Sequence, residues 1–347
     1  MEYFFKIWYN AFNYICKGIN IMKKTIISLM LSACLMGTVA FADANIPDHQ
    51  GTSMDGISIG TSALNSAVKS YSELFKSAGD RYGVDPNLLA AICMQESSGR
   101  NLSVRDDGTE YPAWGIMQIE YTNEKSFAQF GLKTTGEEWT LADRLDPEKA
   151  VPYAAHLISH SLIKYDCDYM KMIQAYNFGE TVLNRIIEAK GDDWLSERAN
   201  AKNYVTNWSY PTYGDAQYIE HVLRYYHKDI DYIGAKVRYK GSLIDFDDQF
   251  PIIEEGRTLI PLRAVSEKLG AKVNWNNEEY QVEITNGQTD IILAINSETA
   301  FIDGDEVMLD VSAKIVNGRT MVPLRFITQV LGIDISWDQD TRTVIIN

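Results

Sequence analysis

The chain has 347 residues, of which 46% are hydrophobic and 23% are charged. This length predicts two or three domains, and the composition is that of a globular protein rather than a disordered or fibrous one. The formal net charge of −15 at pH 7 excludes nucleic acid and anionic lipid surfaces as expected partners, because both would repel the chain.

Residues 1–42 have the features of a secretory signal. Lys23 and Lys24 follow Met22, an apolar run covers residues 26–39, and Ala40-Phe41-Ala42 fits a signal-peptidase site. Met22 is therefore the expected start, and export to the cell wall or the medium is the expected location. The alternatives are a membrane anchor, for which the run is short, or lipid attachment at Cys34.

Cleavage after residue 42 changes the charge and the cysteine count. It leaves 28 basic and 46 acidic residues, a net charge of −18, which suits neutral glycans as partners. Two cysteines remain, Cys93 and Cys167, and separate buried thiols are favoured over a disulfide.

Two regions of different composition follow the predicted signal. Residues 43–64 are rich in Gly, Ser, Thr and Asp and predict a flexible linker. Residues 65–230 show apolar residues at three- and four-residue steps, which predicts a mainly α-helical domain. One helix is expected to start at Asp85-Pro86 and to stop at Gly99. Further helices are predicted at 123–130, 147–164, 168–176, 179–190, 193–201 and 215–228.

Residues 233–347 contain an internal repeat. The peptide GRTLIPLR at 256–263 returns 62 residues later as GRTMVPLR at 318–325, and Trp275 maps onto Trp337 at the same offset. Each unit predicts a turn, a buried strand, an amphipathic helix, a Gly stop and two strands around the Trp. The expected fold class is therefore a mainly α domain followed by an α+β domain with a two-fold internal repeat.

One acidic residue in the helical domain is unusually placed. Leu89, Ile92, Cys93 and Glu96 fall on one helix face, so Glu96 ends an apolar face. Partial burial there would favour the protonated carboxylic acid, which can protonate a glycosidic oxygen. The alternative is a Glu that emerges to solvent at the helix end.

Three motifs in order extend this observation: Glu96-Ser97, Gly115-Ile116-Met117-Gln118 and Ala175-Tyr176-Asn177-x-Gly179. They resemble the motifs of the soluble lytic transglycosylase and goose-type lysozyme superfamily, and residues 82–86 and 214–223 fit the same family. The resemblance covers roughly 68–228. It implies a lysozyme-like fold and cleavage of the β-1,4 bond between N-acetylmuramic acid and N-acetylglucosamine in peptidoglycan glycan strands.

The resemblance also implies residue roles. Glu96 would act as general acid and then as base. Substrate-binding roles fall on Ser97, Met117, Gln118, Tyr176 and Asn177, with Ser97 helping to orient Glu96 or the sugar. Three of these have structural alternatives: Met117 as core, Gln118 as a capping amide and Tyr176 as a packed aromatic.

The identity of the attacking group stays open. Glycosidases usually use two carboxylates, whereas lytic transglycosylases use the 6-hydroxyl of the muramic acid itself. Asp106, Asp107, Glu110 or Glu120 could position a water, or could form an acidic surface. We expect a transglycosylase giving 1,6-anhydro-muropeptides; the alternatives are a muramidase, a chitinase-type hydrolase, and a non-catalytic wall-binding protein.

The repeat resembles the N-terminal domain of copper amine oxidase, a module of secreted Gram-positive proteins. Residues 233–347 contain no His, which excludes a His-ligated copper site, and no metal or other cofactor is expected anywhere in the chain. We predict a binding module for a cell-wall polymer or a protein partner, in a monomeric enzyme. Trp275 and Trp337 are candidates for sugar stacking, with packing in a core as the alternative.

Overall fold

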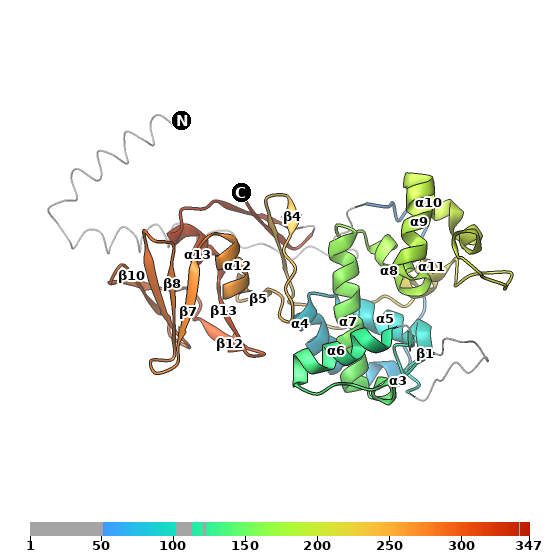
Figure 1. The fold of residues 1–347 in the computed structure, drawn as a ribbon, viewed down its shortest axis with the longest axis horizontal. Coiled ribbons are helices and arrows are strands. Elements are labelled where there is room, and N and C mark those ends of the chain that lie inside the picture. The colour runs from blue at the N-terminus through green and yellow to red at the C-terminus, as the bar shows by residue number, and fades with distance from the viewer. Residues whose placement is uncertain (1–50, 102–112, 121–122, 340) are drawn as a thin grey trace. The chain divides into compact units, whose positions relative to one another are not determined.

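The computed structural model describes residues 51–101, 113–120, 123–339 and 341–347 (Figure 1). The predicted leader with Cys34, and the acidic candidates Asp106, Asp107 and Glu110, lie outside these residues. Residues 45–347 belong to one compact unit. Within the described part of the chain, no helix is both long enough and apolar enough for a membrane span.

The first part is helical, as predicted. Its only strands among the described residues are the two-residue β1 and β2, which are too short to give a periodic sequence pattern. The helices are α3 (Ser66–Lys69), α4 (Ser72–Tyr82), α5 (Pro86–Ser97), α6 (Glu124–Thr135), α7 (Pro147–Lys164), α8 (Tyr169–Phe178), α9 (Glu180–Lys190), α10 (Trp194–Glu197) and α11 (Tyr218–Leu223), with 3-10 turns at Leu141–Leu145, Gly191–Asp193 and Arg198–Tyr204.

Helix α5 occupies the centre of this domain. The Asp85 side chain accepts a hydrogen bond from the backbone N–H of Asn87, Pro86 fills the first turn, and Ser98 ends the helix in a left-handed conformation. Residues 86–93 are all buried. The predicted apolar face of Leu89, Ile92 and Cys93 is fully buried. The other sides of the helix are buried as well, because other elements surround it.

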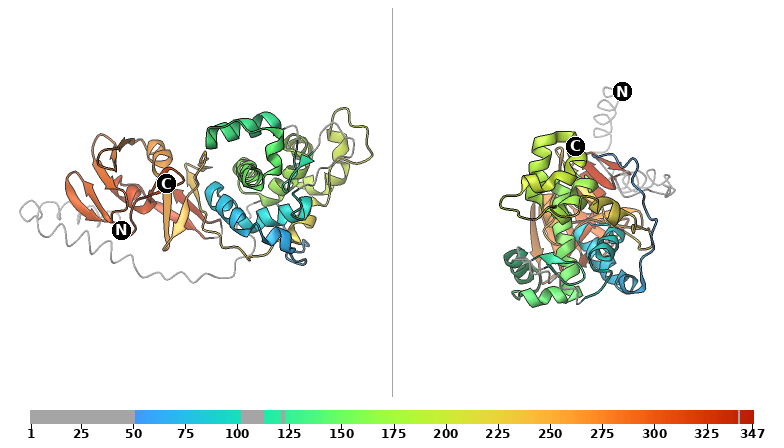
Figure 2. Two further views of the ribbon diagram at one scale, coloured as in Figure 1. Left: turned by 90° about the horizontal axis from the view of Figure 1, so that it is seen from below. Right: turned by 90° about the vertical axis from the view of Figure 1, so that its right-hand side faces the viewer.

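Helix α7 is the other central element. Figure 2 shows it almost end-on, with the other helices of the domain arranged around it. Its buried residues join one continuous hydrophobic core with those of α4, α5 and α8. Cys93 and Cys167 are both buried and form no disulfide, as predicted.

Residues 51–64 are hydrogen-bonded to the helical domain. The backbone N–H and the hydroxyl of Thr52 donate to Asp168 Oδ2 at 3.0 and 2.8 Å. Further along, Gly60 N–H donates to the Leu223 carbonyl at 3.0 Å. The composition that predicts a flexible linker therefore belongs to a segment with specific partners at the N-terminal cap of α8 and on α11.

The second part carries three sheets, ordered β11-β10-β9-β8-β7, β12-β13-β6-β5 and β14-β15-β3-β4. The strands are β3 (Lys236–Tyr239), β4 (Ser242–Leu243), β5 (Ile252–Glu254), β6 (Arg257–Pro261), β7 (Lys272–Asn276), β8 (Gln281–Thr285), β9 (Asp290–Ala294), β10 (Thr299–Ile302), β11 (Asp305–Met308), β12 (Lys314–Val316), β13 (Arg319–Pro323), β14 (Ile335–Asp338) and β15 (Thr343–Ile346); the helices are α12 (Leu262–Lys268) and α13 (Leu324–Val330).

The predicted repeat unit is confirmed in both copies. Strand β6, helix α12 and hairpin β7–β8 match β13, α13 and β14–β15. The equivalent strands β6 and β13 pair antiparallel with Ile260 opposite Val322. Because these two residues are equivalent in the repeat, the pairing has local pseudo-two-fold symmetry, as in an isologous interface.

Candidate functional site

The Gly-Ile-Met-Gln motif forms a tight hairpin between β1 (Ala113–Trp114) and β2 (Ile119–Glu120). Gly115 has a φ of +77°, and a Cβ atom there would lie 2.0 Å from the Arg144 carbonyl oxygen. Only glycine fits this position. Gln118 also has a positive φ, 47°, and its Nε2 donates to the Gly115 carbonyl at 2.8 Å. The turn therefore requires Gly115, and the Gln118 side chain closes it.

Ser97 joins the end of α5 to this hairpin. Its hydroxyl donates to the Ile116 carbonyl at 2.8 Å and accepts from the Gly99 N–H at 3.0 Å. The side chain is buried. Of the two roles expected for Ser97, orienting Glu96 or the sugar, these contacts favour the first, because the residue is enclosed and holds the helix end that carries Glu96.

Tyr176 on α8 ties the third motif to the second. Its hydroxyl donates to the Met117 carbonyl oxygen at 2.8 Å. Burial, and then the charge of Glu96, raises the pKa of Tyr176 well above its usual value, so it stays a neutral donor. The Met117 side chain is 0% exposed, which corrects the expectation that it lines the sugar groove. The side chain packs in the core, and Met117 contributes to the site only through the carbonyl oxygen that accepts from Tyr176.

Glu96 is half-buried at the end of α5 and accepts a hydrogen bond from the hydroxyl of Tyr218 on α11. Burial is the main cause that raises the pKa of Tyr218, and the negative charge of Glu96 adds to it. Tyr218 was not among the predicted site residues. The sequence indicated only that the segment 214–223, which contains Tyr218, fits the same family as the three motifs. It gave no reason to choose one side chain within that segment.

Asn177 holds the chain that leads into α11. Its Oδ1 accepts a hydrogen bond from the Asp215 backbone N–H at 2.6 Å. A Cβ atom at Gly214, whose φ is +58°, would lie 2.6 Å from the same oxygen. Asn177 is nevertheless half-exposed, as are Gln118 and Tyr176, so parts of all three side chains remain available to a ligand.

Glu120 is the one candidate second acid among the described residues. It is exposed at the end of β2. Its negative charge contributes, after burial, to the raised pKa values of Tyr176 and Tyr213. The charge of Glu120 therefore acts on both tyrosines, whereas Asp107 and Glu110 lie in the part of the chain that is not described.

No group of three or more His, Cys, Asp or Glu side chains with metal-binding geometry occurs in the described ranges. His156 and His160 lie in ring contact at 4.5 Å. Burial lowers the pKa of His156 to about 4, and the neighbouring His160 adds to the effect. This histidine is a neutral packing residue against Phe130, at 4.9 Å between ring centres.

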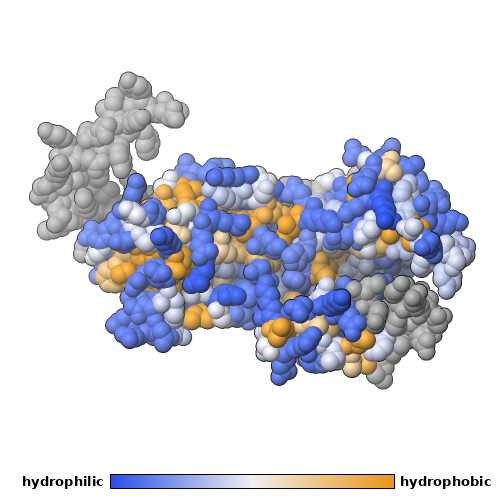
Figure 3. Space-filling model, viewed as in Figure 1, coloured by the Kyte–Doolittle hydropathy of each residue, from blue (hydrophilic) through white to orange (hydrophobic). Residues whose placement is uncertain are grey.

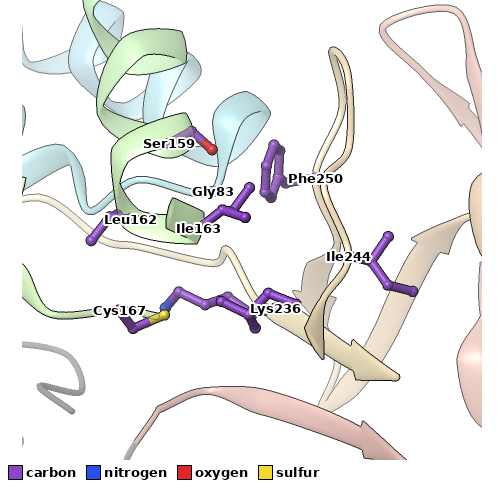
Figure 4. Close-up of a pocket in the computed structure, with 9 residues that line it drawn as sticks. Gly83, Ser159, Leu162, Ile163, Cys167, Lys236, Ile244 and Phe250 are labelled. Carbon is purple, nitrogen blue, oxygen red and sulfur yellow. The ribbon is translucent and has the colours of Figure 1, made fainter. Parts of the chain in front are cut away.

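A small pocket lies apart from these residues (Figure 4). Its lining is mostly apolar, with Leu162, Ile163 and Phe250 among the side chains, and Ser159 and Lys236 add polar groups. No predicted site residue and no carboxylate lines it. We therefore assign it no part in the chemistry.

The arrangement around Glu96 suits general acid catalysis. One half-buried carboxyl group is held by a neutral tyrosine, where hydrogen bonds join α5, α8, α11 and the β1–β2 hairpin. A carboxyl group held in this way can give a proton to a leaving oxygen and later take one back.

Family models match both parts of the chain. Residues 73–194 match the transglycosylase SLT domain, and residues 238–346 match the copper amine oxidase N-terminal domain. Among curated proteins, the peptidoglycan transglycosylase gp16 of Escherichia phage T7 is 34% identical over 140 residues, which is 40% of this chain and 10% of the phage protein. A protease inhibitor of Brevibacillus choshinensis is 28% identical over 100 residues, 28% of this chain and 31% of that protein.

The chain thus spans about a third or less of these two relatives. Among solved structures, an inactive mutant of the lytic transglycosylase Slt from Pseudomonas aeruginosa matches at 16% identity with a TM-score of 0.34. That match covers 47% of this chain and 24% of the Pseudomonas chain.

Proposed function

Because the chain contains a transglycosylase SLT domain followed by a copper amine oxidase N-terminal domain, we propose that it cleaves peptidoglycan glycan strands with Glu96 as its catalytic acid. The bond is the β-1,4 linkage between N-acetylmuramic acid and N-acetylglucosamine. The observation that carries the proposal is the hydrogen bond from the Tyr218 hydroxyl to the Glu96 carboxyl group. It lies beside the hairpin that Ser97 and Tyr176 fix by hydrogen bonds.

The proposed reaction is a transglycosylation in two proton transfers. Glu96 protonates the glycosidic oxygen, and the bond from that oxygen to C1 of the muramic acid breaks. The resulting carboxylate then takes the proton from the 6-hydroxyl of the same sugar, whose oxygen bonds to C1. The products are a 1,6-anhydro-muramic end and a free 4-hydroxyl, and Glu96 is protonated again.

A muramidase is the second candidate, and Glu120 is the observation that favours it. An exposed carboxylate whose charge acts on Tyr176 could activate a water for attack at C1. The product would then be a reducing end, one water heavier than the anhydro end.

Mass spectrometry of released muropeptides distinguishes the two reactions. We expect digestion of purified peptidoglycan to give products that end in 1,6-anhydro-N-acetylmuramic acid, with Glu120→Gln giving the same products. Reducing ends that disappear in Glu120→Gln would establish the muramidase instead. Absence of any cleavage by the wild-type chain would overturn both and leave the non-catalytic alternative.

The proposed location follows from the substrate. Peptidoglycan lies outside the cytoplasmic membrane, and the predicted signal at 1–42 would place the mature enzyme there. Cleavage after Ala42 gives a secreted or wall-associated protein, whereas attachment at Cys34 would give a lipid-anchored one. N-terminal sequencing of the exported protein separates these outcomes.

The C-terminal domain is proposed as a wall-binding module. Trp275 lies on β7 and Trp337 on β14, each an edge strand of its sheet. Their exposures are 37% and 39%, so neither is enclosed in the core. Tyr280 extends the first surface through an edge contact with Trp275, 5.3 Å between ring centres. Two equivalent half-exposed tryptophans give one stacking surface for sugars in each repeat.

Sedimentation with insoluble peptidoglycan tests the module in the full chain. In an inactive Glu96→Gln background, Trp275→Ala/Trp337→Ala should raise the Kd about tenfold, equivalent to ~1.4 kcal/mol. Phe301→Ala is the matched control, since Phe301 is equally exposed in the five-stranded sheet, over which Figure 3 shows apolar surface. Unchanged binding in the double variant would refute this role for the tryptophans.

A further inference from the structure

An aromatic loop, residues 205–214, precedes α11. Residues 203–214 contain no charged side chain, in a chain that is 23% charged. Trp208 and Tyr210 are 38% and 54% exposed, and their ring centres lie 5.3 Å apart. Figure 1 shows the loop extending away from the helices beside α11. Large exposed aromatic side chains without neighbouring charge are typical of binding surfaces.

Hydrogen bonds fix the loop at both ends. Arg185 Nη1 donates to the Tyr204 carbonyl at 2.8 Å, and the Tyr213 hydroxyl donates to the Phe178 carbonyl at 2.8 Å. Within the loop, Trp208 Nε1 donates to the Thr212 carbonyl at 2.7 Å. The indole N–H is therefore satisfied locally, and a ligand can use the ring without leaving a polar group unpaired. A loop held in this way binds with a small entropic cost.

The loop is continuous with the catalytic motifs. Tyr213 packs against Phe178 at 5.8 Å and against Trp208 at 4.9 Å between ring centres. Phe178 follows Asn177 directly, and the charge of Glu120 contributes, after burial, to the raised pKa of Tyr213. A chain of rings thus leads from Phe178, beside the Ala-Tyr-Asn motif, through Tyr213 to Trp208.

We propose that the aromatic loop is a distal glycan subsite, in which Trp208 and Tyr210 stack on sugar rings of the strand beyond the scissile bond. The proposal rests on the proposed function. The C–H faces of a pyranose pack against aromatic rings, and the hydroxyl and N-acetyl groups at the rim of the sugar hydrogen-bond to Ser209, Thr212 and Asn207. The neutral loop selects the amino-sugar backbone rather than the charged stem peptides.

Binding of peptide-free glycan strands tests the subsite without relying on turnover. In the Glu96→Gln chain, Trp208→Ala/Tyr210→Ala is expected to raise the Kd about tenfold, equivalent to ~1.4 kcal/mol. Trp208→Phe keeps an aromatic ring and should therefore lose less affinity than the double variant. Leu132→Ala is the control, because Leu132 on α6 is 48% exposed and lies outside the loop and the site. Wild-type affinity in the double variant would overturn the proposal.

Kinetics in the active chain give a second readout. The double variant should raise KM for long glycan strands more than it lowers kcat, because the loop touches sugars away from the reacting bond. A fall in kcat at unchanged KM would overturn the subsite and point to disturbed packing around Asn177. Failure of the catalytic proposal looks different: turnover would persist in Glu96→Gln, while the binding comparison is unaffected.

Discussion

Replacing Glu96 by Gln is expected to lower kcat for peptidoglycan cleavage by about a thousandfold, within the ~10²–10⁴ that a positioned general acid contributes. The amide N–H is far too weakly acidic to protonate the glycosidic oxygen. It keeps the size of the side chain and an oxygen that can accept from Tyr218, so the fold should be unchanged. Release of soluble muropeptides measures the loss, and wild-type turnover in this variant would contradict the assignment.

Two further substitutions sharpen the result. Tyr218→Phe removes the hydrogen bond to Glu96 but keeps the buried ring. A hydrogen bond to a charged group is worth about 1.5–3 kcal/mol, which corresponds to a rate loss of about ten- to a hundredfold. Glu120→Gln should retain turnover if the sugar's own hydroxyl attacks. A loss in Glu120→Gln as large as that in Glu96→Gln would indicate a water held by Glu120.

The largest stability effect is expected at Asp85, which begins α5 and thereby positions Glu96. Its Oδ1 accepts from the Asn87 N–H and Nδ2 at 2.8 and 2.9 Å, and its Oδ2 accepts from the Tyr226 hydroxyl. Asp85→Ala removes a helix cap worth about 1 kcal/mol and the hydrogen bond that the buried Tyr226 hydroxyl donates to Asp85, worth about 1–3 kcal/mol. We expect a loss of about 2–4 kcal/mol in the free energy of unfolding.

Asp146→Ala is the matched control. Asp146 also precedes a proline and caps a helix, accepting from the Glu148 N–H at 3.0 Å, but it is half-exposed and holds no buried tyrosine. It should cost about 1 kcal/mol. Urea unfolding followed by far-UV circular dichroism compares the two variants. Equal losses would show that burial of the Asp85 network adds nothing to the cap.

Asp85 also predicts a pH dependence. Burial raises the pKa of Asp85 above its usual value, while hydrogen bonds from Tyr226 and Asn87 oppose the shift. The folded state then keeps its proton at pH values where the unfolded state has lost it. The contribution of Asp85 to the free energy of unfolding is fully present below the unfolded-state pKa of about 3.9. It is lost as pH rises through the raised pKa of the folded state.

Asp85→Asn cannot ionise, so it isolates this effect. As pH rises from 4 towards neutrality, the free energy of unfolding of the wild type should fall relative to that of Asp85→Asn. Contributions from other titrating groups cancel in the difference. A difference that is constant with pH, or that moves in favour of the wild type, would rule out a raised pKa for Asp85.

Local sequence patterns were sufficient for most of the fold. The start of α5 at Asp85-Pro86 and its end near Gly99, the helical domain, and both repeat units all depend on interactions between near neighbours in the chain. Periodicity and turn residues report such interactions directly. The β1–β2 hairpin was missed because two-residue strands have no period.

The site itself depended on contacts across the chain. Tyr218 and Glu96 are 122 residues apart, and Tyr176 and the Met117 carbonyl are 59 apart. The sequence alone determined which motifs are present and that Glu96 ends a helix. Only the tertiary structure decided that Ser97 and Met117 turn inward while Tyr218 reaches Glu96, because the direction of a side chain follows from the packing of all the elements around it.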